Sequence, residues 1–250
     1  VIGDSVTTIG SSAFYYCKGM TGDLVIPDTV TEIGASAFEG CNSLQSLTMP
    51  LASGEYIGYY FATNNEYIPS SLRTLRLMGT GSLSYGAVSG CKYIEELYLE
   101  GYTSIASYSA GECYNLRNID FVNATNLTTI GNNAFDACTS LETVTVSAGV
   151  ESIGGSAFAR CTSLKNINVE ADNTNYKSID GNLYTKDGKT LIQYAIGKSD
   201  TSFIIPDSVT TIGSSAFYNC DSLTSVEIPS SVTEIGFSVF AGCDSLTSIT

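Results

Sequence analysis

One pattern of hydrophobic and polar positions recurs along the whole chain with a spacing of about 23 residues. It reads L-x-x-[VIL]-x-[IVL]-P-x-x-V-x-x-I-G-x-x-A-F-x-x-C, and the stretch from Ile212 to Pro229 recurs almost letter for letter from Ile235 onward. A fixed period of this length is typical of a solenoid, in which each unit buries its apolar face only by stacking on its neighbours. Residues 1–250 are therefore expected to form a single solenoid of about ten coils.

The first part of the repeat, L-x-x-L-x-L, predicts a short strand. Alternation along a strand places the fourth and sixth positions inside and the third and fifth outside. A proline lacks the backbone N–H, so it should end the strand ladder after Pro27, Pro50, Pro206 and Pro229. The Ile-Gly step should form the next turn, with its glycine at the positive φ that glycine adopts at little steric cost.

The Ala-Phe step predicts a helical or 3₁₀ turn on the convex side, with the phenylalanine pointing into the core. The expected fold is thus a right-handed leucine-rich-repeat solenoid. It is a β-rich horseshoe or superhelix, with short strands on the concave side and helical or 3₁₀ turns on the convex side. The phenylalanines of successive coils should form one buried column: Phe14, Phe38, Phe135, Phe158, Phe217 and Phe240.

Two insertions, at residues 51–69 and 170–199, interrupt the repeats. The first is rich in aromatic residues, and two interpretations stay open. It packs onto the flank of the solenoid, or it binds a carbohydrate or a protein loop through amphipathic rings. In the second insertion, Asp180-Gly181 and Asp187-Gly188 each predict a type I′ hairpin turn. The aromatic residues of the first insertion are Tyr56, Tyr59, Tyr60, Phe61 and Tyr67.

All eight cysteines occupy the same repeat position, so they should form a ladder along one edge of the solenoid. Neighbouring coils lie about 4.8 Å apart, within the reach of a disulfide, so distance alone does not separate bridged from free thiols. However, a ladder gives each rung the same side-chain direction, which favours free, buried thiols that pack as small apolar groups. Without histidine or a CxxC pair, a zinc site is disfavoured. The cysteines are Cys17, Cys41, Cys91, Cys113, Cys138, Cys161, Cys220 and Cys243.

Charge and composition narrow the classes of function. The net charge is -14, with 25 acidic and 11 basic residues, and this balance repels nucleic-acid phosphates. The apolar runs are too short for a membrane-spanning helix. The chain has no histidine, which rules out Ser-His-Asp and Cys-His catalysis within it. The sequence therefore predicts a non-catalytic protein with no metal and no cofactor.

The repeated phrase I-P-D-S-V-T-x-I-G-x-x-A-F-x-x-C-x-S-L-T-S-V-x-I-P resembles the BspA-like leucine-rich repeats, also called the Treponema type. This resemblance covers nearly the whole chain. It implies a bacterial surface or secreted protein, similar to adhesins that bind host proteins and other cells, and no shared catalytic residues. Family members usually end the second insertion in Tyr-Pro. Here Ala195 follows Tyr194, which should weaken that turn. Because the chain begins and ends in mid-repeat, it is expected to be part of a longer protein.

The outward strand positions are small and neutral in most repeats, such as Thr143 and Thr145, but they change in three central repeats. There they include three of the four arginines of the chain. Arginine and tyrosine are enriched at binding hot spots. Two interpretations stay open: a binding patch, or a surface of cross-strand ion pairs such as Arg76–Glu95 and Glu96–Arg117. The candidate ligand-binding residues are Arg73, Arg76, Glu95, Glu96, Tyr98, Arg117 and Asp120.

The leading hypothesis is a cell-surface or secreted module that binds a host or bacterial surface protein through the concave face. Two alternatives remain. One is a structural spacer or stalk that displays another domain, and the other is a carbohydrate-binding module that uses the aromatic insertion. A spacer should have uniform outward residues, and the stretch from Arg73 to Asp120 is not uniform.

Overall fold

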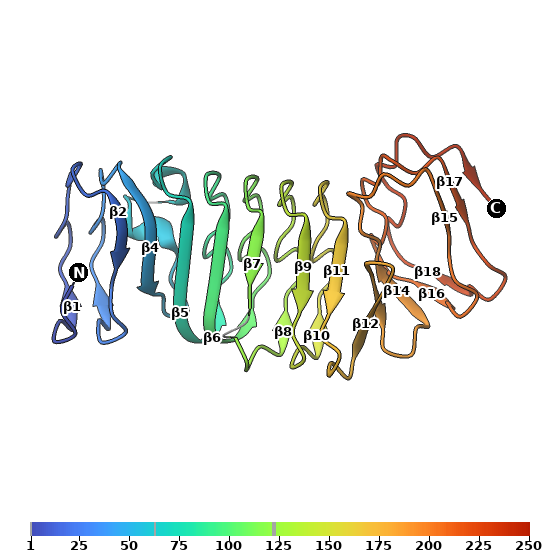
Figure 1. Ribbon diagram of the computed structural model, residues 1–250, viewed down its shortest axis with the longest axis horizontal. Helices are drawn as coiled ribbons and strands as arrows, with labels where there is room; N and C mark the ends of the chain where they lie inside the picture. The colour runs from blue at the N-terminus through green and yellow to red at the C-terminus, as the bar shows by residue number, and fades with distance from the viewer. Residues whose placement is uncertain (1, 63, 122–123) are drawn as a thin grey trace.

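The computed structural model describes residues 2–62, 64–121 and 124–250. The coils follow one another along the long axis of the molecule (Figure 1). The L-x-x-L-x-L segment of each repeat forms one strand, and we call the surface built by these parallel strands the long-strand face. Its strands are β2 (Gly22–Val25), β4 (Leu44–Pro50), β5 (Thr74–Leu83), β6 (Glu96–Ile105), β7 (Asn118–Asp120), β9 (Thr143–Val146), β11 (Asn166–Val169), β15 (Ser202–Ile204), β17 (Ser225–Glu227) and β19 (Ser248–Ile249).

A second side of the solenoid is built by two-residue strands that end at the isoleucine of the Ile-Gly step. Pro27, Pro206 and Pro229 stand at the turn that leads to this side, whereas Ser147 and Glu170 stand there after β9 and β11. Met78 and Glu100 stand where Pro50 ends β4, and strands β5 and β6 continue past them for ten residues each. The long strands end at or just before each proline, as predicted, although β9 and β11 end at the same position without one. The short strands are β1 (Thr8–Ile9), β3 (Glu32–Ile33), β8 (Thr129–Ile130), β10 (Ser152–Ile153), β16 (Thr211–Ile212) and β18 (Glu234–Ile235).

The glycine of the Ile-Gly step serves a different purpose from the predicted one. Positive φ was expected, yet Gly34, Gly154 and Gly236 are not among the residues with positive φ. A Cβ on Gly34 would lie 2.3 Å from the backbone N of Ser11, and one on Gly154 would lie 2.4 Å from the backbone N of Asn132. At Gly34 and Gly154 glycine is thus required because the adjacent coil approaches too closely for a side chain, whereas Ser84 and Ala106 occupy the same position in two other repeats.

The expectation of helical or 3₁₀ turns on the convex side is wrong. This side consists of turns in which two residues per coil, four positions apart, have positive φ, for example Ser12 at 56° and Tyr16 at 56°. A left-handed residue interrupts a helix of L-residues, so no helix propagates. Instead alternate N–H groups reach the next coil, as in Phe14 N to Ala37 O at 2.8 Å. Among the described residues, 3₁₀ helices occur only in the first insertion, as η1 (Ile57–Tyr60) and η2 (Asn65–Tyr67).

The core is a stack of aliphatic and aromatic layers, divided into two clusters that meet at Leu183 and Tyr184. The phenylalanine column is confirmed in part, because Phe14 and Phe240 at the ends are only half-buried. Phe135 and Phe158 stack with centroids 5.7 Å apart. The column is interrupted at the repeats where Val88 and Ala110 take the phenylalanine position. The fully buried phenylalanines of the predicted column are Phe38, Phe135, Phe158 and Phe217.

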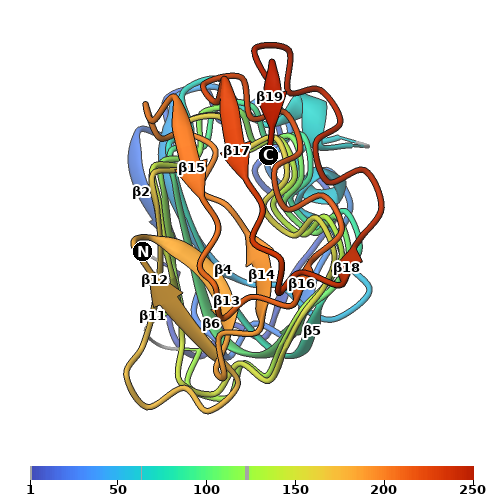
Figure 2. The ribbon, with the colours of Figure 1, turned by 90° about the vertical axis from the view of Figure 1, so that its right-hand side faces the viewer.

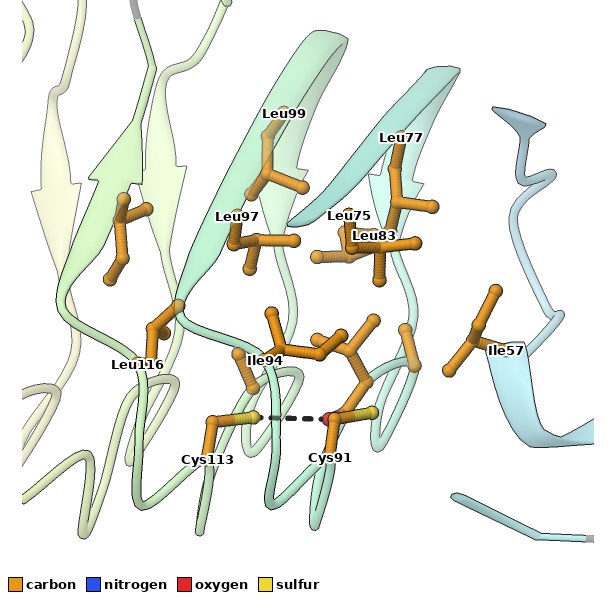
Figure 3. Packing of buried hydrophobic residues seen from close by; sticks show 14 of the residues in the cluster. Ile57, Leu75, Leu77, Leu83, Cys91, Ile94, Leu97, Leu99, Cys113 and Leu116 are labelled. Carbon is orange, nitrogen blue, oxygen red and sulfur yellow. Dashed lines mark hydrogen bonds between the residues drawn. The ribbon is translucent and has the colours of Figure 1, made fainter. Parts of the chain in front are cut away.

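The cysteine ladder forms as predicted, with free thiols. Six rungs are buried, Cys243 is half-buried and Cys17 is exposed. Most rungs donate their thiol to a backbone carbonyl of the preceding coil, as from Cys113 Sγ to Val88 O at 3.2 Å. Figure 3 shows Cys91 and Cys113 at matching positions on neighbouring coils, beneath the leucines of β5 and β6. The shared side-chain direction, expected to favour free thiols, is thus present.

The first insertion packs partly onto the solenoid. Tyr60 and Phe61 are buried, whereas Tyr59 is 40% and Tyr67 is 58% exposed. The Asn65 side chain holds the segment together. It accepts from Gly58 N at 2.7 Å and donates to Gly86 O and Ser89 O on the next coil. The packing interpretation is therefore confirmed for Tyr60 and Phe61, and the binding interpretation stays a prediction for the exposed rings.

The second insertion adds an antiparallel hairpin and a third strand: β12 (Tyr176–Ile179), β13 (Asn182–Thr185) and β14 (Thr190–Gln193). Asp180 and Gly181 both have positive φ, which confirms the type I′ turn. At the other turn only Gly188 has positive φ, so that type I′ prediction is wrong. Figure 2 shows the solenoid from its C-terminal end, with β15, β17 and β19 side by side.

The turn after Tyr194 is held by a hydrogen bond that proline would forbid. Ala195 N donates to the Asn182 Oδ1 atom at 3.0 Å, and both residues are buried. Tyr194 itself occupies the core, with its ring 5.1 Å from that of Phe217. Alanine was expected to weaken this turn, but here its N–H donates to the buried amide oxygen of Asn182.

Candidate functional site

The predicted ligand-binding residues lie on or just before three adjacent strands of the long-strand face, β5, β6 and β7. The register pairs Arg76 with Tyr98 and Tyr98 with Asp120, and it pairs Glu96 with Asn118. The other three residues, Arg73, Glu95 and Arg117, immediately precede their strands. The structure thus brings all seven together, and we call them the central patch.

One half of the central patch is an ion-pair chain across three coils. Glu95 forms ion pairs with both flanking arginines, with Oε1 3.1 Å from Arg73 Nε and Oε2 3.8 Å from Arg117 Nε. The backbone repeats this order, because Glu95 N donates to Arg73 O and Arg117 N donates to Glu95 O. Neither Arg76–Glu95 nor Glu96–Arg117 is among the ion pairs of the described residues, so those two predicted pairs are wrong.

The other half of the patch centres on Tyr98. The Arg76 guanidinium lies over the Tyr98 ring, 3.9 Å from its centroid, in a cation–π contact. The Tyr98 hydroxyl donates to Glu96 Oε2 at 3.1 Å, and Thr74 Oγ1 donates to the same oxygen at 3.3 Å. Desolvation, followed by the hydrogen bond to Glu96, raises the pKa of Tyr98, so the hydroxyl stays a neutral donor. These contacts hold Arg76 and Tyr98 in fixed orientations.

The energetics of the patch indicate little contribution to folding. The side chains of Arg73 and Glu95 are 46% and 40% exposed, and Arg117 is 70% exposed. Exposed ion pairs of this kind contribute about 0–1 kcal/mol. Three arginines and three carboxylates also give the patch a formal charge of zero in a chain of net charge -14. The patch is therefore chemically distinct from the surrounding surface without being needed to stabilise it.

Two neighbouring outward residues were missed by the sequence reasoning. Met78 and Glu100 follow Arg76 and Tyr98 by two positions on the same strands, and the register pairs them with each other. The alternation of inward and outward residues that identified the patch continues through Met78 and Glu100. The same sequence pattern could therefore have identified both residues. They extend the chemically varied surface toward the corner where the first insertion leaves the solenoid.

Within the described part of the chain, no group of three or more histidine, cysteine or acidic side chains is arranged to hold a metal ion. No described helix is long and apolar enough to span a membrane.

Parallel strands that stack their leucines at this period define a leucine-rich-repeat solenoid of about ten turns. The family model of the BspA type leucine-rich repeat region matches the chain in six copies, over residues 1–76, 70–187 and 194–250. The chain belongs to this family. No curated protein matches it at a significant level.

Three solved structures resemble the chain. A leucine-rich-repeat protein from Eubacterium ventriosum is 19% identical, with a TM-score of 0.59, over 80% of this chain and 65% of that one. A leucine-rich cell surface protein from Faecalibacterium prausnitzii is 28% identical, with a TM-score of 0.57, over 98% and 64%. The pneumococcal vaccine antigen PcpA is 18% identical, with a TM-score of 0.57, over 99% and 64%. The chain thus spans less than two thirds of the length of each.

Proposed function

We propose that this protein is a non-catalytic interaction module of a bacterial surface or secreted protein, and that it adheres to a host or bacterial surface protein through the central patch. The observation that carries the proposal is local. Most of the long-strand face presents small neutral residues, whereas β5, β6 and β7 bring three arginines and a tyrosine together. These residue types contribute most to binding energy at protein interfaces.

The cell-surface location is part of the same proposal. The Faecalibacterium relative is named a cell surface protein and PcpA a vaccine antigen, and both share this fold. Family membership also favours a protein-binding scaffold.

The geometry of the patch supports binding over a purely structural role. Arg76 and Tyr98 are already ordered by their mutual contact, which lowers the side-chain entropy lost on association. The exposed Arg73–Glu95–Arg117 chain is weak enough for a partner's charges to replace it. Complementary charges would also make association faster at low ionic strength.

The test is capture of partners from extracts of host extracellular matrix and of bacterial surfaces. The wild type is compared with Arg76→Ala/Tyr98→Ala/Arg117→Ala, and Thr143→Ala/Thr145→Ala on β9 is the matched control on the same face. We expect the triple variant to lose the partner, with each truncation costing about 1–3 kcal/mol, while the control retains it. If the triple variant keeps every partner at unchanged affinity, the side chains of the patch only pair with one another. That result would favour the hypothesis of a structural spacer.

The aromatic insertion favours a second candidate, carbohydrate binding, because it exposes several rings. The Tyr56 and Tyr59 rings meet edge to face at 70°, with centroids 6.2 Å apart, so they do not form one flat platform. Glycan-array binding that is lost in Tyr59→Ala/Tyr67→Ala and retained in the patch variant would establish this candidate in place of the first.

A further inference from the structure

A cavity of about 470 Å³ lies beside the central patch, at the corner between the long-strand face and the first insertion. Part of its wall comes from the next row of outward residues, because Pro50, Met78 and Glu100 are register partners on β4, β5 and β6. The row before it holds Thr48, Arg76 and Tyr98, about 7 Å away along the strands. The cavity and the patch therefore form one continuous surface.

The cavity exists because these coils depart from the standard repeat. A Cβ on Gly79 would lie 2.5 Å from the Tyr102 ring and 2.7 Å from Leu51 O, so the backbone approaches closely there. The Tyr102 hydroxyl donates to Leu51 O at 2.9 Å and fixes the start of the insertion. The insertion then contributes Glu55 and Tyr60 to the wall in place of an ordinary coil.

The lining combines apolar walls with carboxylates. Val30, Ile33, Leu51 and Met78 supply aliphatic surface, and the acidic residues are Asp28, Glu55 and Glu100. None of the described residues that line the cavity is a lysine or an arginine. A ligand that matches both features carries a positive charge on an aliphatic stem.

Glu55 is positioned as the charged anchor. Its Oε2 atom accepts from the Tyr60 hydroxyl at 2.7 Å and from Ala52 N at 3.0 Å. Both hydrogen bonds end on the same oxygen, so Oε1 can accept from a ligand. The buried Tyr60 ring behind the carboxylate lowers the local polarity, which strengthens a charge pair formed there.

We propose that this cavity takes the side chain of a lysine or arginine from the protein partner, with its stem against Leu51 and Met78 and its cationic group at Glu55 and Glu100. This inference rests on the proposed function, because the partner that supplies the side chain lies across the central patch. The volume is within the range of sites that enclose small ligands.

The test uses the whole chain and a small probe, Nα-acetyl-lysine methylamide, with its norleucine analogue as the uncharged control. The chain has three methionines, and their methyl groups serve as reporters in NMR. We expect only the Met78 methyl to shift in a saturable way, while the fully buried Met49 and the distant Met20 stay unchanged. The norleucine analogue should bind about tenfold more weakly. A Met78 methyl signal that does not shift, or equal affinity for the lysine probe and its norleucine analogue, would overturn the inference.

The matched variant is Glu55→Gln/Glu100→Gln, in which the glutamine Oε1 can still accept the bonds from Tyr60 and Ala52. This variant should weaken binding of the lysine probe about tenfold or more. Glu142→Gln, which removes one exposed carboxylate next to β9, should have no effect. Unchanged affinity in the double variant would contradict the proposed site.

Failure of this inference is distinguishable from failure of the proposed function. If the patch variant loses a captured partner while the Met78 methyl signal does not shift with the lysine probe, the proposed function stands and the cavity inference is overturned. If the lysine probe binds but no partner depends on the patch, the cavity binds cations and the proposed function fails.

Discussion

Cysteine reactivity at the residue scale follows directly from position in the ladder. Burial raises the pKa of Cys91 and Cys138 well above that of a free thiol, and the contact with the next rung raises it further. The thiolate is the reactive form of cysteine. These two thiols therefore react slowly for two reasons: they are buried, and they stay protonated. Cys17 differs because it is exposed.

We therefore expect Cys17 to be the first thiol that a maleimide labels in the native protein, as read by peptide mass spectrometry. Unfolding without reductant should expose all eight thiols. The control is Cys17→Ser, which should remove the fast phase. Fewer than about six thiols after unfolding would show that rungs are bridged, against the free ladder seen here.

A second residue-scale prediction concerns the end of the second insertion. Ala195→Pro removes the donor that satisfies the buried Asn182 Oδ1 atom. Among the described residues, the Asn182 Nδ2 atom has no hydrogen-bond partner. The substitution should therefore destabilise the protein by about 1–3 kcal/mol, measured by urea unfolding, although the family usually has proline there. Ala195→Gly keeps the N–H and controls for the position. A proline variant as stable as the wild type would contradict this role.

At the scale of the element, the coils interact with their immediate neighbours, and the second insertion separates two core clusters. Phe158 lies in the first cluster, stacked on Phe135, and Phe217 lies in the second, between Tyr194 and Phe240. Strand pairing on the long-strand face is also absent between β11 and β15, where the insertion hairpin contacts β11 instead.

Phe158→Ala should leave a cavity that costs about 3–5 kcal/mol locally. Hydrogen exchange should accelerate around residues 130–169, while the coils near Leu75 and Leu99 stay protected. Phe217→Ala is the matched variant, and it should accelerate exchange in the second cluster instead. Uniform loss of protection along the whole chain in either variant would show that the solenoid unfolds as one unit.

Much of this architecture could be predicted from the sequence because the repeat is explicit. The strands, the cysteine ladder and the clustering of the patch residues follow from register alone. What could not be predicted depends on contacts between coils. Ser12 and Tyr16 have positive φ although neither is a glycine, so the sequence does not mark their conformation. The role of Gly34 depends on how closely the backbone of Ser11 approaches it. Side-chain pairing in the patch likewise depends on rotamers that the pattern does not encode.

At the scale of the whole molecule, buried tyrosines link stability to alkaline pH. Burial, and then the charge of Asp180, raise the pKa of Tyr184 from 10.0 to about 12. Burial is also the main cause of the raised pKa of Tyr60, Tyr102 and Tyr194. The unfolded chain loses these protons first, so above about pH 10 it binds fewer protons than the folded state and stability falls as pH rises.

The free energy of unfolding should therefore be insensitive to these groups below about pH 10 and decline between about pH 10 and 12. Tyrosinate absorbance followed together with circular dichroism is the measurement. Exposed tyrosines should ionise before the protein unfolds, and the buried tyrosines should ionise as it unfolds. Tyr184→Phe should reduce the slope in this window, and ionisation of every tyrosine in the folded state would contradict the burial assigned here.

Binding through the central patch is tested most directly by hydroxyl-radical footprinting with the captured partner bound. The exposed tyrosines lie on the coils up to Tyr114. Together with Tyr98, they let one experiment compare the central patch, the first insertion and the convex side of these coils. We predict reduced oxidation of Tyr98 and Met78, with no change at the exposed Tyr15 and Tyr16 on the convex side. Protection of the insertion residues Tyr56, Tyr59 and Tyr67, with Tyr98 oxidised as in the free protein, would contradict binding at the central patch.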